Sequence, residues 1–335
     1  MYNSIITGTG YYVPENIVTN DDLSKLMDTS DAWIQERTGI QQRHFATRGK
    51  DTTTSMGVCA AQMAMEKAKI NKEDIDFLIF ATLSPDYYFP GCGVLVQKEL
   101  GLHTVGALDI RNQCSGFIYA LSVADQFIKT GMYKNVLVIA SEMQSPALDL
   151  TTRGRNMAVL FGDGAGAAVL SRSEENGKGI LSSHLHSEGA HAEELAILTP
   201  GVGKKWVTDL LKENDPEDTS YFPYMNGQFV FKNAVVRFSE VIIEGLKANK
   251  LTESDINLFI PHQANLRISQ FIQQKFNLPD AKVFNNIQKY GNTTAASIAI
   301  ALAEAVEQDR IKENDIILLA AFGSGFTWGS VVIKW

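Results

Sequence analysis

The chain contains Asp74-Ile75-Asp76-Phe77-Leu78-Ile79 and, 181 positions later, the closely similar Asp255-Ile256-Asn257-Leu258-Phe259-Ile260. Two further pairs keep the same order at nearly the same shift: Ala120-Leu121 with Ala301-Leu302, and the apolar run from Val136 with the run from Ile316. Three ordered matches at nearly one offset favour an internal duplication, and the period is far too long for a solenoid. We therefore expect two copies of a βαβ-rich unit that pack together.

The repeated segments alternate between strand-like and helix-like patterns. Near-continuous apolar runs occupy residues 77–81, 136–140, 258–260 and 316–320. Such runs are typical of strands that are buried on both faces of a sheet. Segments 115–129 and 294–306 instead have apolar residues at i, i+3, i+4 and i+7, the pattern of a helix. The sequence thus predicts an α/β fold in which sheets lie between helices.

Composition and charge exclude several classes of protein. The 335 residues are 45% hydrophobic and 20% charged, enough for two domains and a large core. A formal net charge of −8, without a run of Lys and Arg, argues against a nucleic-acid binder. No window reaches the roughly 18 apolar residues of a membrane span, and the N-terminus reads as a strand and not as a signal peptide.

Three cysteines, Cys59, Cys92 and Cys114, are odd in number and match no metal-ligand spacing. We therefore expect a soluble, cytoplasmic protein, in a reducing compartment where a free thiol can serve as a nucleophile.

Cys114 directly follows the strand-like segment 105–110 and directly precedes the helical segment that starts at Ser115. A thiol at a helix N-terminus faces the positive end of the helix dipole and free backbone N–H groups. That environment predicts a thiol pKa below the usual value of about 8.5 and a place for a thioester oxyanion. Because most free cysteines are small core residues, position alone leaves a packing role for Cys114 equally open.

His262 and Asn292 occupy related positions in the second half of the chain. His262 follows the strand-like run 258–260, and Asn292 immediately precedes the helical segment 294–306. Catalytic groups gather at strand ends and helix starts of α/β units. Taken singly, each residue has a structural explanation: His262 as a capping histidine and Asn292 as an ordinary helix N-cap. Together with the duplication, they predict that Cys114 and Asn292 both sit at strand-to-helix junctions related by a pseudo-twofold axis, while His262 ends a strand of the second half.

In these contexts, Cys114, His262 and Asn292 resemble the catalytic residues of β-ketoacyl-ACP synthase III, a family of the thiolase superfamily. Six matching stretches run in the family's order from near the first residue to near the last. They are Thr29-Ser30-Asp31-Ala32-Trp33, Arg37-Thr38-Gly39-Ile40, Phe161-Gly162-Asp163-Gly164-Ala165-Gly166, Pro261-His262-Gln263-Ala264-Asn265-Leu266-Arg267, Gly291-Asn292-Thr293-Thr294-Ala295-Ala296-Ser297 and Phe322-Gly323-Ser324-Gly325-Phe326-Thr327-Trp328-Gly329. The resemblance implies a thiolase-like fold, with residues 1–172 and 173–335 as pseudo-symmetric halves of a five-layer α-β-α-β-α sandwich.

The resemblance also implies a decarboxylative Claisen condensation that starts fatty-acid synthesis, without a resident cofactor or metal. Cys114 takes the acyl group of an acyl-CoA primer, and malonyl-ACP then loses carbon dioxide and attacks the acyl-cysteine as an enolate. His262 and Asn292 donate hydrogen bonds to the malonyl thioester oxygen, a role that suits a neutral imidazole. The backbone N–H groups of Cys114 and Ser324 form a second oxyanion hole, where the family usually has glycine in place of Ser324.

Contacts with coenzyme A follow from the same resemblance. Trp33 and Arg37 correspond to residues that line the CoA entrance, where Trp33 stacks on the adenine. Arg267 also belongs to this entrance. A second arginine of the family's entrance corresponds to either Arg153 or Arg155, because the segment around them is about two residues longer than usual.

Protein partners are implied as well. Lys232, Arg267 and Lys275 form a basic patch for the acidic acyl carrier protein, since electrostatic steering depends on the local field and not on net charge. Phe89 corresponds to the aromatic residue that crosses the interface of a homodimer and bounds the acyl pocket of the other subunit.

Two other motifs have structural explanations. The glycine-rich stretch 162–166 superficially suggests a phosphate loop, but an apolar strand follows it, so we expect tight structural turns. His184 and His186 alternate as on a strand, and without a third ligand in evident spacing a structural role is favoured over a metal site.

Three other functions are compatible with parts of the sequence. A condensing enzyme that makes polyketides, alkylresorcinols or hydrocarbons from a longer primer shares the same three residues. Gln113, the stretch 84–88 and the polar, irregular excursion at 201–224 depart from the common pattern, so the primer remains open. A degradative thiolase is disfavoured because residues 322–329 contain no second cysteine. A catalytically silent partner protein should have lost Cys114.

Overall fold

Two mixed sheets with the same strand order form the framework of the chain, whose computed structural model describes residues 2–201, 203 and 218–335. The first sheet has the order β1-β7-β6-β4-β5 and the second β8-β13-β12-β11. The strands of the first are β1 (Asn3–Tyr12), β4 (Phe77–Ala81), β5 (Gly106–Ile110), β6 (Asn135–Glu142) and β7 (Gly164–Ser173). Those of the second are β8 (Gly179–Ser187), β11 (Leu258–Pro261), β12 (Ile316–Gly323) and β13 (Thr327–Lys334).

The directions of the strands also match. In the first sheet, β7 is antiparallel to both β1 and β6, while β4 runs parallel to β6 and β5. In the second, β13 is antiparallel to both β8 and β12, and β11 runs parallel to β12. Val283 then bridges Phe259 of β11 in parallel, at the place that β5 takes in the first sheet. The two halves are therefore pseudo-symmetric, as the repeat predicts, whereas their limits at 172 and 173 stay a prediction.

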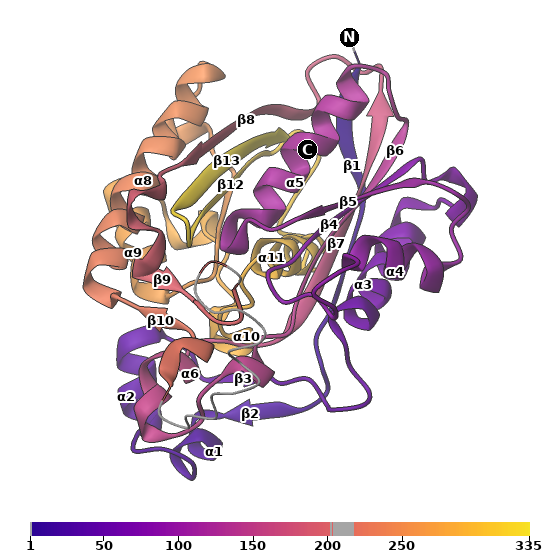
Figure 1. Cartoon of the computed structure of the whole chain (residues 1–335). Coiled ribbons are helices and arrows are strands. Elements are labelled where there is room, and N and C mark those ends of the chain that lie inside the picture. Colours follow the sequence, from indigo (N-terminus) through magenta and orange to yellow (C-terminus); the bar gives the residue numbers. More distant parts are fainter. Residues whose placement is uncertain (1, 202, 204–217) are drawn as a thin grey trace.

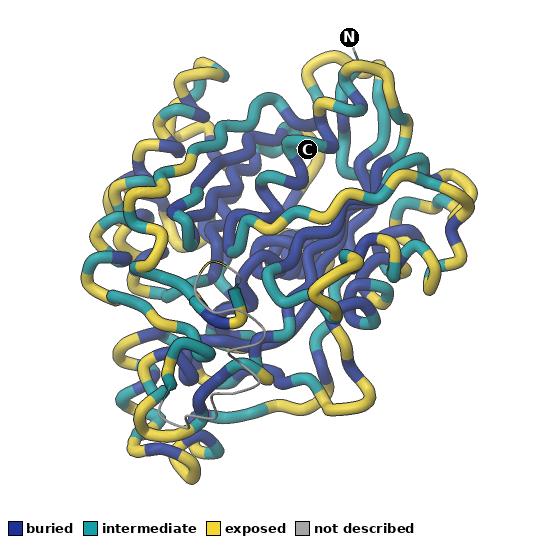
Figure 2. Tube along the Cα trace, viewed as in Figure 1, coloured by how far each residue is buried: buried dark blue, intermediate teal, exposed yellow. Residues whose placement is uncertain are grey.

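Helices separate and cover the sheets, which gives the five layers of the thiolase-like fold (Figure 1). One pair covers the outer face of the first sheet, a second pair lies between the sheets, and a third covers the second sheet. In that order the pairs are α3 (Thr53–Ala68) with α4 (Cys92–Leu100), α5 (Gly116–Lys129) with α11 (Ala296–Glu307), and α8 (Gly227–Ala248) with α9 (Leu266–Lys275). The central layer is buried almost throughout (Figure 2).

Small residues explain how two sheets close on the central layer. Every residue of α11 from Ala296 to Ala305 is buried, and five of these ten residues are alanine. A Cβ atom at Gly166 of β7 would lie 2.5 Å from the Cβ atom of Ala299, so only glycine fits there. The glycine-rich stretch 162–166 therefore has the structural role that we expected of it, as a place where a strand and a helix pack closely.

Smaller elements form a cap at one end of the sandwich (Figure 1). They are β2 (Ile17–Thr19), α1 (Asn20–Ser24), α2 (Asp31–Thr38), β3 (Gln42–His44), α6 (Arg155–Ala158), β9 (Leu195–Ala196), β10 (Tyr224–Met225) and α10 (Ile287–Tyr290). The fully buried Arg43 joins this cap to the framework, donating to Asn20 Oδ1 at 2.8 Å and to the carbonyl oxygen of Val159 at 2.7 Å.

Three sequence-based expectations concern the chain as a whole. All three cysteines are free thiols. Within the described residues, no helix is both long enough and apolar enough to cross a membrane. Most of the predicted excursion at 201–224 lies outside the described residues; within it, Thr219–Tyr221 forms a 3-10 turn.

Candidate active site

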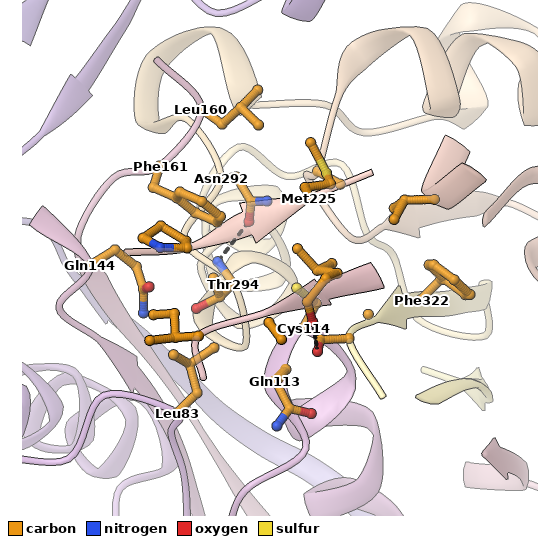
Figure 3. Close-up of a pocket in the computed structure, with 18 of the residues that line it drawn as sticks. Leu83, Gln113, Cys114, Gln144, Leu160, Phe161, Met225, Asn292, Thr294 and Phe322 are labelled. Atoms are coloured by element: carbon orange, nitrogen blue, oxygen red, sulfur yellow. Dashed lines mark hydrogen bonds between the residues drawn. The ribbon is translucent and has the colours of Figure 1, made fainter. Parts of the chain in front are cut away.

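Cys114, His262 and Asn292 line one cavity of about 690 Å³ (Figure 3). Cys114 lies in a 3-10 turn between β5 and α5, and His262 directly follows β11. Asn292 lies between α10 and α11. The structure thus brings together the three residues that the sequence selects, although they come from three different connections.

The starts of α5 and α11 face one another across the central layer. A Cβ atom at Gly116 would lie 3.2 Å from the Cβ atom of Ala295. Gln113 and Thr294, which are 181 positions apart, both have a positive φ, of 43° and 46°. The repeat therefore equates Cys114 with Ala295. Asn292 lies three residues earlier, ahead of the helix that the offset pairs with α5, although it follows α10 and not a strand.

Backbone pairing explains the displaced position of Asn292. Its N–H donates to the carbonyl oxygen of Leu160 at 2.8 Å, and its carbonyl oxygen accepts from Gly162 N–H at 3.1 Å. This bridge to the segment around Phe161 fixes the residue before α11 begins. The side-chain Oδ1 accepts from Thr294 N–H at 2.8 Å, the bond drawn in Figure 3. The amide NH₂ of Asn292 is therefore the group that can donate to a ligand.

Cys114 is only 8% exposed and packs directly against the end of β12. A Cβ atom at Gly323 would lie 2.8 Å from the Cβ atom of Cys114, so the close approach requires glycine. Burial, with a smaller contribution from the nearby Glu142 carboxylate, raises the pKa of Cys114 to about 12. The predicted lowering of this pKa is therefore wrong, because the buried sulfur loses the solvation that would stabilise a thiolate.

Two backbone N–H groups act in the opposite direction on the thiol. Those of Cys114 and Ser324 both hydrogen-bond to the sulfur and lower the pKa of Cys114. They are the N–H groups that the resemblance assigns to an oxyanion hole. The hydroxyl group of Ser324 donates to the carbonyl oxygen of Leu195, so this side chain has a partner of its own.

Glu142, which the sequence analysis did not select, lies buried at the end of β6. It accepts from Ser84 Oγ at 2.8 Å and from Ala295 N–H at 3.3 Å. Burial raises the pKa of Glu142 to about 7. An acidic residue directly after an apolar strand was the available signal, since a buried carboxylate requires specific partners.

His262 is a buried, neutral imidazole. Burial lowers the pKa of His262 to about 3, so the ring carries a single N–H hydrogen at physiological pH. Its Nδ1 atom lies 2.6 Å from Ser297 Oγ. Its Nε2 atom is buried and has no hydrogen-bond partner among the described residues. A buried polar atom without a partner at a cavity wall is suited to bind a ligand.

A second cavity, of about 740 Å³, adjoins the first and shares Leu160, Met225 and Phe231 with it. Trp33, Arg37 and Arg267 line this second cavity. The guanidinium carbon of Arg37 lies 4.3 Å from the centroid of the Trp33 ring. Three predicted entrance residues thus gather at one opening.

Arg155 and Arg153 have different environments. The guanidinium carbon of Arg155 lies 4.8 Å from the centroid of the Trp33 ring. Arg153 donates to Asp149 at 2.7 Å and lies over the ring of Phe222. Of the two arginines that the sequence analysis left open, Arg155 is therefore the one next to Trp33.

Comparison with known proteins decides the family. The sequence is 46% identical over 330 residues to the beta-ketoacyl-[acyl-carrier-protein] synthase III of Caldanaerobacter subterraneus, which covers 98% of this chain and 97% of that protein. The chain belongs to this family. Its members are condensing enzymes that transfer acyl groups.

Further comparisons agree with this assignment. Residues 108–189 match the family model for 3-oxoacyl-[acyl-carrier-protein (ACP)] synthase III, and residues 246–335 match the model for its C-terminal part. The crystal structure of the synthase III of Aquifex aeolicus superposes with a TM-score of 0.90 at 44% identity, covering 99% of this chain and all of that one. The priming β-ketosynthase of the R1128 polyketide pathway has a TM-score of 0.89 at 31% identity, covering 99% and 96%.

The remaining predicted residues of this synthase III lie outside the catalytic cavity. Lys232 on α8 and Lys275 on α9 are exposed, as is Arg267. Phe89 is 82% exposed and does not line the cavity, although its neighbour Tyr88 does. The roles of these residues stay predictions.

His184 and His186 of the synthase lie on β8, as the alternating pattern predicts. His184 Nδ1 lies 3.3 Å from one carboxylate oxygen of Glu244, and His186 Nε2 lies 2.6 Å from the other. Each histidine thus has a carboxylate partner, which favours the structural role.

Proposed function

We propose that this β-ketoacyl-ACP synthase III condenses an acyl-CoA primer with malonyl-ACP and so starts a fatty-acid chain. One observation carries the proposal: a thiol and two N–H donors, from His262 and Asn292, line the same cavity. A thiol can store an acyl group between two half-reactions, and paired donors can stabilise an enolate. These steps call for no resident cofactor.

Acylation is the first half-reaction. The sulfur of Cys114 attacks the thioester carbonyl carbon of the primer, the bond from that carbon to the sulfur of CoA breaks, and the departing thiolate takes the proton that Cys114 loses. Negative charge collects on the carbonyl oxygen, where the N–H groups of Cys114 and Ser324 donate to it. Their hydrogen bonds to the sulfur support this assignment.

Condensation is the second half-reaction. The bond between the malonyl Cα and its carboxylate breaks, and the electron pair moves toward the malonyl thioester oxygen. His262 and Asn292 donate to that oxygen and so stabilise the enolate. Carbon dioxide departs, the enolate carbon attacks the acyl-cysteine carbonyl, and the Cys114 thiolate leaves and takes a proton from water to restore the thiol. A neutral His262 fits this role because no proton has to be removed from the substrate.

Coenzyme A would enter through the second cavity. The indole of Trp33 offers a flat apolar face for adenine, and Arg37, Arg155 and Arg267 offer charge for its phosphates. The exposed Lys232, Arg267 and Lys275 would receive the acidic carrier protein.

Two arginine variants test this entrance. Arg155→Ala should raise KM for acyl-CoA about tenfold, a loss of about 1.4 kcal/mol in binding, because it removes one charge beside Trp33. Arg153→Ala is the matched comparison, since it removes the same charge from the same segment, at a side chain that lies over Phe222 and not beside Trp33. Both arginines also have protein partners, Asp149 for Arg153 and Asp28 for Arg155. Steady-state kinetics at fixed malonyl-ACP measure both effects. A larger increase for Arg153→Ala would reverse the assignment.

A second copy of the chain would complete the acyl pocket. Among the described residues, strand β5 is an open edge of the first sheet, and Tyr88 and Phe89, which come just before the α4 helix that packs on β5, are 71% and 82% exposed. An open strand edge beside exposed aromatic side chains is suited to pair with a copy of itself. We propose a homodimer in which Phe89 reaches the cavity of the other subunit. The free thiols support a cytoplasmic location.

A longer primer is the second candidate, because Gln113 and Tyr88 line the cavity and depart from the common pattern. A panel of acetyl-, branched- and medium-chain CoA, each with malonyl-ACP, separates the two candidates by the 3-oxoacyl-ACP that forms. Acetyl or branched short primers should be used if the enzyme starts fatty acids. Products from medium chains alone would favour a secondary pathway, and no product from any primer would contradict both.

A further inference from the structure

Ser297 contacts Nδ1 of the His262 ring, the nitrogen opposite the Nε2 atom that would bind the substrate. It lies in the first turn of α11 and is 2% exposed. Its Oγ atom is 2.6 Å from His262 Nδ1 and 3.4 Å from the backbone nitrogen of Gln263. No other hydrogen bond of this hydroxyl group occurs among the described residues, so these two contacts decide how its hydrogen is used.

The direction of the Ser297–His262 bond follows from the donors and acceptors present. The backbone N–H of Gln263 can only donate, so Ser297 Oγ accepts from it. The hydroxyl hydrogen then has one acceptor available, His262 Nδ1. If Nδ1 carried a hydrogen instead, the hydroxyl hydrogen would be buried without an acceptor, at a cost of about 1–3 kcal/mol. We propose that Ser297 is a positioning residue that holds His262 as the tautomer with its hydrogen on Nε2.

This tautomer is the one that the condensation requires. The proposal rests on the donor role of His262 in the proposed function. An Nε2–H group can donate to a developing enolate oxygen, whereas an Nε2 lone pair would repel it. Because the pKa of His262 is about 3, the ring has one hydrogen to place, and its position decides between these cases.

The same helix start orients the other donor. Thr294 N–H holds Asn292 Oδ1, which leaves the amide NH₂ for the ligand, and Ser297, one turn later, holds His262 Nδ1. Thr294, just before α11, and Ser297, in its first turn, therefore direct two N–H donors at one cavity. Since the helix N-terminus is also the positive end of the dipole, it further disfavours a protonated imidazole.

The inference is tested first without any activity. Nitrogen-15 NMR of protein labelled in histidine reports which ring nitrogen carries hydrogen, and His262→Asn identifies the signal. The wild-type ring should carry its hydrogen on Nε2 with Nδ1 unprotonated. A hydrogen on Nδ1 would overturn the proposal even if the enzyme condenses its substrates, whereas an inactive enzyme with the expected tautomer would contradict only the proposed function.

Two variants then connect the tautomer to the reaction. Ser297→Ala should lower kcat for malonyl-ACP decarboxylation about ten- to hundredfold, the range seen when metal-bound histidines lose the group that orients them. KM for malonyl-ACP and the acylation of Cys114 should change little, and Ser297→Thr, which keeps the hydroxyl group, should retain most of the decarboxylation. A folded Ser297→Ala protein with wild-type decarboxylation would refute the positioning role.

Discussion

Replacing His262 by alanine is expected to lower the rate of malonyl-ACP decarboxylation by about 10²–10³-fold, the effect of removing one donor from an oxyanion hole. The His262 Nε2 atom at the cavity wall is the physical reason, since it has no partner in the part of the chain that the structure describes and is the donor that would hold the enolate oxygen. Release of labelled carbon dioxide measures the rate. Asn292→Ala should have a similar effect, because it removes the second donor.

Acylation provides the control for both variants. Transfer of an acyl group from acyl-CoA to Cys114 uses the N–H groups at Cys114 and Ser324, so His262→Ala should still accept the primer. Wild-type decarboxylation by His262→Ala would contradict the role of this residue. Loss of both half-reactions together would instead indicate a general disturbance of the cavity.

The pH dependence of decarboxylation follows from the pKa of His262, which is about 3 in the folded chain against an ordinary value of 6.5. The imidazole therefore stays neutral between pH 5 and 8, and His262 should add no ionisation to the decarboxylation profile there. The free energy of unfolding, in contrast, should depend on pH through this residue. Because the unfolded chain binds this proton at higher pH than the folded chain does, the folded state loses stability as pH falls from 6.5 toward 3.

Replacing Cys114 by alanine is expected to lower condensation by more than about 10³-fold, since without the sulfur no covalent acyl intermediate forms. Malonyl-ACP decarboxylation should persist, because His262 and Asn292 remain in the cavity. Product formation and carbon dioxide release, measured on the same sample, separate these steps. Condensation by Cys114→Ala at a wild-type rate would show that another group carries the acyl chain.

Much of the framework was predictable from the sequence, because strands that are buried on both faces consist of near-continuous apolar residues. The apolar runs at 77–81 and 258–260 became β4 and β11, and the helical segments at 115–129 and 294–306 became α5 and α11 within two residues. The constant offset between the runs also predicts the equal strand orders. Strand pairing at the edge was less regular, since in the second sheet a single bridge at Val283 stands in place of a strand equivalent to β5.

The chemistry of the site was harder to predict from the sequence, because it depends on distances between segments that are far apart in the chain. The dipole argument gave the wrong direction for the pKa of Cys114, since burial and Glu142 outweigh the N–H groups beside the sulfur. Ser297 and Gly323 lie inside recognised motifs, yet only their contacts with His262 and Cys114 reveal what they do.

The central claim is that Cys114 carries the acyl group between the two half-reactions. The direct measurement is a chase: the enzyme is incubated with acyl-CoA, freed of excess primer, and analysed by mass spectrometry before and after addition of malonyl-ACP. The account predicts one acyl increment on the peptide that contains Cys114 and its quantitative transfer to 3-oxoacyl-ACP. No adduct, or an adduct that malonyl-ACP leaves in place, would contradict it.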